Sequence, residues 1–211
     1  MQRETFARGV AALGAGLGGI ALALQFVLIV RQIGAPWLAA WRFVGFFTIL
    51  SNLLVAFVLF RAAVRRPCSR RLELSCATAI VMVGLVYSLL LRATWSPQGA
   101  QKLADVALHD VAPVVFLLYF LTRPRPALSL SDALAALVFP LGYVVYALAR
   151  GVADGWYAYW FLDPSRLGAG QMALSVIALA AAFFAAALAL TWLSNALNAA
   201  TARANALSRS G

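Results

Sequence analysis

Residues 170–193 read GQMALSVIALAAAFFAAALALTWL and contain no charged side chain in 24 positions. About 20 predominantly apolar residues are enough for an α-helix to cross the hydrocarbon core of a membrane. This stretch therefore predicts a transmembrane helix, and similar stretches precede it along the chain.

The chain contains six such apolar runs. The predicted spans are approximately residues 10–30, 40–60, 74–91, 106–121, 131–149 and 170–193. Six crossings with short connections occupy all 211 residues, so we expect a single transmembrane domain over 1–211, an all-α polytopic bundle of six helices. The composition is 64% hydrophobic and 11% charged, whereas soluble domains are roughly 45–50% apolar and about 25% charged. A soluble enzyme is therefore excluded.

The formal net charge of +10 comes from cations in the gaps between the apolar runs. Eleven arginines fall in the termini and the second and fourth connections, against six cations on the other side. Cytoplasmic loops of membrane proteins carry such an excess, so both termini are expected in the cytoplasm. The basic connection, residues 61–71, is expected to contact anionic lipid head groups. No nucleic-acid partner is expected, because that interpretation requires a basic face on a soluble fold.

The second predicted span contains an unusual polar cluster. Thr48, Ser51 and Asn52 lie three and four residues apart, so they share one helical face. Hydroxyl and amide groups inside hydrocarbon need hydrogen-bond partners, and neighbouring helices or their own backbone could supply them. Alternatively, the cluster forms part of a reaction site.

His109 is the only histidine of the chain and lies about one turn inside the fourth predicted span. An ionisable side chain within a membrane span is a functional candidate, and imidazole can act as a base and then as an acid near neutral pH. Asp105, four residues earlier, could hold one ring nitrogen. The alternative is a hydrated histidine at a helix start.

Together these residues suggest a nucleophile and its base. A threonine hydroxyl must be activated by an adjacent base, so Thr48, His109 and Asp105 would follow the logic of a hydrolytic triad if the second and fourth helices are neighbours. Ser51 competes for the role of nucleophile. Asn52 could donate a hydrogen bond to a developing oxyanion.

The segment Phe47-Thr48-Ile49-Leu50-Ser51-Asn52, followed by Leu108-His109 and Pro113, resembles the androgen-induced and FAR-17a-like integral membrane protein superfamily, and most closely its small bacterial six-helix members. Eukaryotic members are intramembrane threonine hydrolases that cleave fatty acid esters of hydroxy fatty acids. The resemblance implies that Thr48 is the nucleophile and His109 its partner. It also implies a bacterial inner-membrane location and a membrane lipid or fatty-acyl substrate.

Other polar residues are weaker candidates. Tyr87 and Ser88 could line a pocket, and Arg92 could either bind a substrate carboxylate or extend to the membrane interface. The aromatic connection of residues 155–161 fits an interfacial belt or a lid over a lateral opening. No metal-ligand motif or phosphate loop is present in the sequence, so no metal or cofactor is expected.

These patterns favour a lipid-ester hydrolase with a threonine nucleophile and a histidine base. The alternative is a non-enzymatic small transporter or a lipid-binding membrane protein, which would retain its ligand after either residue is changed. A structural subunit of a larger complex is a third hypothesis, for which the sequence offers no specific feature.

Overall fold

The computed structural model describes residues 2–210 of the chain, with side chains as far as residue 204. Within this range the chain is all-helical, as predicted, and no β-strand is formed. The α-helices are α1 (Gln2–Ile33), α2 (Pro36–Phe43), α3 (Phe47–Ala63), α4 (Arg70–Val86), α5 (Gly99–Val106), α6 (Ala112–Thr122), α7 (Leu130–Ala135), α8 (Val138–Asp154), α9 (Pro164–Leu167) and α10 (Ala169–Ser210). The π-helical turns η1 (Tyr87–Leu91) and η3 (Ala107–Val111) extend α4 and join α5 to α6, and the 3₁₀ turns are η2 (Arg92–Thr94) and η4 (Trp160–Leu162).

Five helical segments are long and apolar enough to cross a membrane. A bent pair, α2 and α3, passes the same test when its two helices are taken together, which gives up to six spans. These helices are typical of an integral membrane protein. The five segments are Gln2–Ile33, Arg70–Thr94, Gly99–Thr122, Leu130–Asp154 and Ala169–Ala204.

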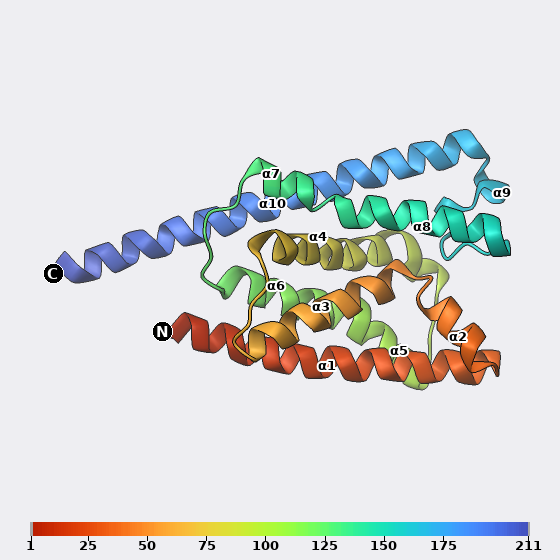
Figure 1. The fold of residues 1–211 in the computed structure, drawn as a ribbon, viewed down its shortest axis with the longest axis horizontal. Coiled ribbons are helices and arrows are strands. Elements are labelled where there is room, and N and C mark those ends of the chain that lie inside the picture. Colours follow the sequence, from red (N-terminus) through yellow and green to blue (C-terminus); the bar gives the residue numbers. More distant parts are fainter. Residues whose placement is uncertain (1, 211) are drawn as a thin grey trace.

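The helices extend beyond the predicted spans because a helix continues past the hydrocarbon core wherever propensity allows. The fourth predicted span begins at Gly99 rather than near residue 106. The last helix continues to Ser210 rather than ending near residue 193, through an alanine-rich segment of strong helix formers. In Figure 1 this extension of α10 projects beyond the rest of the bundle, at the end where the N-terminus also lies.

The second predicted span, residues 40–60, is not one helix. It is broken between α2 and α3, whose axes differ by 83°. Phe46, the residue before α3, is extended with ψ 131°. Gly45 leaves no room for a side chain, because a Cβ there would lie 2.6 Å from Arg150 Nη1 and 2.7 Å from the Trp156 ring.

Side chains of α8 satisfy the carbonyl groups that the break leaves without helical partners. The Tyr143 hydroxyl donates to Gly45 O at 2.9 Å, and the Arg150 guanidinium donates to Trp41 O at 2.8 Å. Tyr146 likewise donates to Val44 O. Irregular backbone at membrane depth is tolerated where protein groups satisfy it, so α8 makes the break possible.

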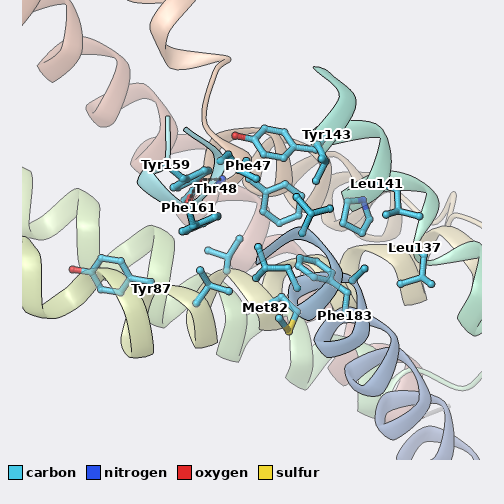
Figure 2. Close-up of a pocket in the computed structure, with 18 of the residues that line it drawn as sticks. Phe47, Thr48, Met82, Tyr87, Leu137, Leu141, Tyr143, Tyr159, Phe161 and Phe183 are labelled. Carbon is cyan, nitrogen blue, oxygen red and sulfur yellow. Dashed lines mark hydrogen bonds between the residues drawn. The ribbon is translucent and has the colours of Figure 1, made fainter. Parts of the chain in front are cut away.

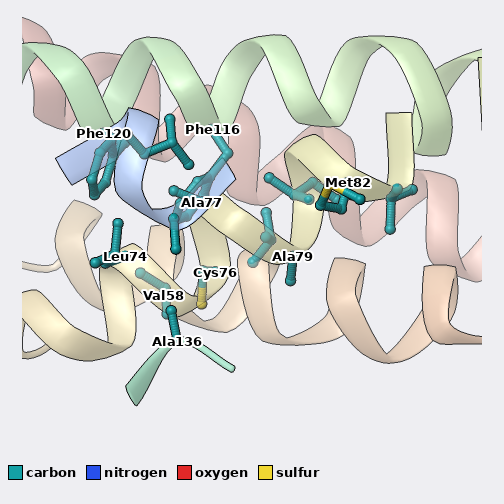
Figure 3. Close-up of a cluster of buried hydrophobic side chains, with 14 of the residues drawn as sticks. Val58, Leu74, Cys76, Ala77, Ala79, Met82, Phe116, Phe120 and Ala136 are labelled. Atoms are coloured by element: carbon teal, nitrogen blue, oxygen red, sulfur yellow. The ribbon is translucent and has the colours of Figure 1, made fainter. Parts of the chain in front are cut away.

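Helix α4 lies between the α1, α3 and α6 side of the bundle and the α8 and α10 side (Figure 1). Figure 3 shows its buried contacts, with Leu74 and Ala77 of α4 beside Phe116 and Phe120 of α6. Gly14 lets α1 approach closely, because a Cβ there would lie 2.7 Å from Val115 and 2.8 Å from Leu59. Close packing at this glycine agrees with the small-residue interfaces of membrane helices.

Candidate active site

Thr48 is the second residue of α3, immediately after the break. The first backbone N–H groups of a helix have no partner within the helix, so the break exposes donors beside the Thr48 hydroxyl. Asn52, one turn later, donates from Nδ2 to Thr48 O at 2.8 Å and to Leu108 O at 3.2 Å. This amide therefore fixes the first turn of α3 against η3.

His109 lies in the π-helical turn η3. Pro113, four residues later, has no N–H with which to bond the His109 carbonyl, which favours a local widening of the helix. Gly84 of α4 accommodates this carbonyl, because a Cβ there would approach His109 O to 3.1 Å. Single π-helical turns within α-helices are frequent at functional sites.

The structure brings the two main candidates together. Thr48 Oγ1 lies 3.3 Å from His109 Nε2, so the segments that hold them are neighbours. On the other side of the ring, His109 Nδ1 lies 2.9 Å from the backbone oxygen of Asp105 and 3.3 Å from its carboxylate Oδ1. If Nδ1 carries the proton and donates it to Asp105, Nε2 is free to accept a proton from Thr48.

Tyr87 supports this arrangement in a way that the sequence did not indicate. Its ring stacks on the His109 imidazole with a centroid separation of 4.0 Å. Its hydroxyl donates a hydrogen bond to Asp105 Oδ2. Tyr87 therefore fixes both the plane of the imidazole and the carboxylate behind it.

Tyr159 is the residue that sequence reasoning missed, although it lies in the aromatic connection considered as a lid. Its hydroxyl lies 3.4 Å from Thr48 Oγ1 and accepts a hydrogen bond from Thr48 N at 3.4 Å. Burial raises the pKa of the Tyr159 phenol, so the hydroxyl keeps its proton at neutral pH. A protonated donor thus lies beside the candidate nucleophile.

A cavity of about 60 Å³ begins at Thr48 and runs between α4, α8 and α10. In Figure 2, Thr48 lies beside Tyr159 and Phe47, and Met82, Leu137 and Phe183 line the part farther from it. Most of the other lining side chains are also apolar. They are Val83, Val86, Leu91, Pro140, Leu141, Val144, Phe161, Leu162, Val176, Leu179 and Ala180, together with Tyr87 and Tyr143.

Two of the predicted pocket residues lie elsewhere. Ser88 and Arg92 do not line the cavity, whereas Tyr87 does. The Arg92 guanidinium forms an ion pair with Asp110 and donates to Ser88 Oγ at 3.4 Å. The Ser88 and Arg92 side chains are both exposed, so Arg92 is not placed to bind a substrate carboxylate in this cavity.

Asn52 and Ser51 have surroundings that differ from those expected for an oxyanion donor and a nucleophile. Both Asn52 amide hydrogens are engaged by backbone oxygens, so this side chain is not directed at a developing oxyanion. Ser51 is buried, and its hydroxyl has no hydrogen-bond partner among the described residues. Thr48, not Ser51, is the hydroxyl within reach of the imidazole.

No group of three or more His, Cys, Asp or Glu side chains converges within the described part of the chain. Comparisons with models of protein families, with curated proteins and with solved structures found no match for this chain. The chemistry of the site must therefore be argued from its own geometry.

Proposed function

We propose that the chain is an intramembrane lipid-ester hydrolase in which Thr48 is the nucleophile and His109 the general base. The observation that carries this proposal is the 3.3 Å approach of Thr48 Oγ1 to His109 Nε2, with a cavity of mainly apolar walls beginning at the same hydroxyl. A hydroxyl paired with an oriented base is the arrangement that nucleophilic catalysis requires.

In the first half of the reaction, Thr48 Oγ1 attacks the ester carbonyl carbon and its proton passes to His109 Nε2. The tetrahedral intermediate collapses when His109 returns this proton to the departing alkoxide, which leaves as an alcohol. In the second half, a water molecule gives a proton to His109 and attacks the acyl-threonine. The acid is released, and the proton returns to Thr48.

The oxyanion of each intermediate would be stabilised by Tyr159 and by the Thr48 backbone N–H. Both groups lie beside the Thr48 hydroxyl, and the negative charge would develop on the carbonyl oxygen of the ester that this hydroxyl attacks. Preorganised donors at this position, in a site shielded from water, contribute more than they would in bulk solvent. The dipole at the start of α3 adds a favourable field for an anion.

The substrate class follows from the cavity walls and from the resemblance of the Thr48 and His109 segments to the androgen-induced and FAR-17a-like superfamily. We propose a membrane lipid with an aliphatic acyl chain, and specifically fatty acid esters of hydroxy fatty acids. Ligand pockets usually have volumes of about 300–1,000 Å³, whereas this cavity measures about 60 Å³. Substrate binding therefore requires the aromatic connection or the α8–α10 seam to move.

We further propose that α2 and α3 together form one span, which gives six crossings in a bacterial inner membrane with both termini in the cytoplasm. The support is the excess of arginines at the ends that would face the cytoplasm. Thr48 and His109 would then lie near the outer side of the bilayer.

Ester turnover by the purified chain in proteoliposomes tests the proposal. The wild type should release a fatty acid from a fatty acid ester of a hydroxy fatty acid, and Thr48→Ala and His109→Ala should each reduce the rate at least about 10³-fold. Ser51→Ala is the matched control, because its hydroxyl is on the same helix but away from the imidazole, and it should retain turnover.

Turnover that is equal in Thr48→Ala and the wild type would contradict the proposal. Binding of the ester without turnover, unchanged in both variants, would favour the lipid-binding alternative.

A further inference from the structure

A second cavity, of about 430 Å³, lies far along the bundle from Thr48. It is lined by the beginning of α1, the end of α3 and the end of α6. Figure 1 shows these three helix ends on the side of the bundle where both chain termini lie. The volume falls within the range of small-molecule sites, about 300–1,000 Å³.

Arginines from three different helices or their ends line this cavity. They are Arg8 of α1, Arg65 just beyond α3 and Arg123 at the end of α6, and the only carboxylate among the lining residues is that of Glu4. The walls therefore carry an excess of positive charge, at the ends of helices that are apolar enough to cross a membrane.

The buried Glu73 carboxylate neutralises only one of the three lining arginines, Arg123. The buried Glu73 carboxylate accepts from Tyr119 at 2.8 Å and forms ion pairs with Arg123 and Arg125. Arg8 and Arg65 form no ion pair with the acidic side chains of residues 2–204. Two guanidinium groups thus line a cavity without a carboxylate partner.

The backbone conformation of Arg65 independently indicates that this residue has a function. Arg65 has φ +60° and is the only described residue other than glycine with a positive φ. Its N–H bonds to Ala62 O, and that of Arg66 bonds to Arg61 O, which forms the helix termination in which glycine is usual at this position. A strained residue at a site where glycine would be favoured suggests that the arginine side chain has a function.

We propose that this cavity binds a phosphate-bearing anion through Arg8 and Arg65, beside Arg123, which is already paired with Glu73. Arginine donates in a planar fork that matches phosphate oxygens, and basic pockets between the ends of membrane helices bind lipid head groups. The phosphate could belong to an anionic phospholipid or be free in solution. The site is independent of Thr48 and of the hydrolase proposal.

The test measures thermal unfolding of the full-length chain in neutral detergent. One arm adds phosphatidylglycerol to the micelles, and the other adds inorganic phosphate against chloride of the same ionic strength. At least one addition should raise the unfolding midpoint, because a ligand that binds only the folded state stabilises it. If only the lipid raises the midpoint, the ligand is a lipid head group. If inorganic phosphate raises it, the ligand is a free anion.

Three variants distinguish an effect on anion binding from an effect on folding. Arg65→Gly removes the charge and also relieves the strained backbone, so the midpoint without ligand should stay the same or rise while affinity falls about fivefold. Arg8→Gln should weaken binding by a similar factor. Arg66→Gln is the control, because it removes an adjacent charge that does not line the cavity, and it should bind as the wild type does.

The proposal is overturned if neither addition raises the midpoint of the wild type. It is equally overturned if Arg65→Gly and Arg66→Gln change the affinity by the same factor, because the effect would then be general surface charge.

Discussion

At the scale of single residues, the proposed catalytic groups are held by side chains that do not themselves react. Tyr87 stacks on His109 and hydrogen bonds to Asp105, and Asn52 ties the first turn of α3 to η3. Each of these contacts restricts a rotation that would separate Thr48 from the imidazole. The site is therefore preorganised before any substrate arrives.

Replacing Tyr159 with phenylalanine should lower kcat about 100-fold and leave KM nearly unchanged. The hydroxyl is expected to act on the oxyanion, and loss of one such donor costs about 10²–10³ in kcat. Tyr157→Phe is the matched control, because it removes a hydroxyl from the same connection but outside the cavity lining. Steady-state turnover in proteoliposomes measures both variants. An unchanged kcat in Tyr159→Phe would leave Tyr159 as a structural residue only.

Arg125 and Arg123 should differ in how strongly their replacement by methionine lowers stability. Burial lowers the pKa of Arg125 to about 10, which means that the fold disfavours its charged form and that this charge reduces stability at pH 7. Its three guanidinium nitrogens are buried without hydrogen bonds. Arg125→Met should therefore lower the unfolding midpoint less than Arg123→Met does, because Arg125 approaches Glu73 only to 3.5 Å and makes no hydrogen bond to it.

Arg123→Met is the paired comparison. Of the two arginines, Arg123 is the one that hydrogen bonds to the buried Glu73, and its loss should cost about 3–5 kcal/mol. Thermal unfolding of both variants in detergent measures how much stability each one loses. A lower midpoint for Arg125→Met than for Arg123→Met would mean that Arg125, not Arg123, is the main partner of Glu73.

At the scale of elements, the break between α2 and α3 places Thr48 in a first helical turn. Gly45→Ala should disturb this break, because the added methyl group would collide with Arg150 and Trp156. We expect a loss of about 1–3 kcal/mol in stability and a fall in turnover as Thr48 shifts. Gly142→Ala in α8 is the control, since no atom lies within 4 Å of its Cβ position. Equal stability of the two variants would mean that the break adapts to a side chain.

The sequence predicts the helical elements well and their irregularities poorly. Apolar runs identify the spans because burying backbone in hydrocarbon requires long helices. The break after Gly45 leaves no comparable signal, because the groups that satisfy its carbonyls, Tyr143 and Arg150, lie about 100 residues away. The π-helical turn at His109 is indicated only by Pro113, which many helices tolerate without widening.

The candidate site also contains some residues that the sequence indicates and others that it does not. Thr48 and His109 could be found from sequence because polar groups are rare in apolar spans, and the structure places them together. Tyr87 and Tyr159 could not be assigned, since one depends on a stacking contact between helices and the other on the path of a connection. Ser88, Arg92 and Asn52 have surroundings that differ from the expected ones, because periodicity gives the face of a helix but not its neighbours.

At the scale of the whole molecule, both termini lie at the same end of the bundle (Figure 1). Six crossings would place them on the same side of the membrane. A fluorescent protein fused to the C-terminus should therefore fold in the cytoplasm, and alkaline phosphatase fused there should be inactive. Fusions truncated in the connection after α8 should give the opposite pattern. Active phosphatase at the C-terminus would contradict the proposed topology.

The most direct test of the central proposal is the position of a covalent adduct. The purified chain is treated with a fluorophosphonate carrying a long alkyl chain, and the modified residue is located by mass spectrometry. An adduct should form on Thr48. It should be absent in Thr48→Ala, form far more slowly in His109→Ala and be unchanged in Ser51→Ala. An adduct on Ser51, or labelling of Thr48→Ala equal to the wild type, would contradict the proposal.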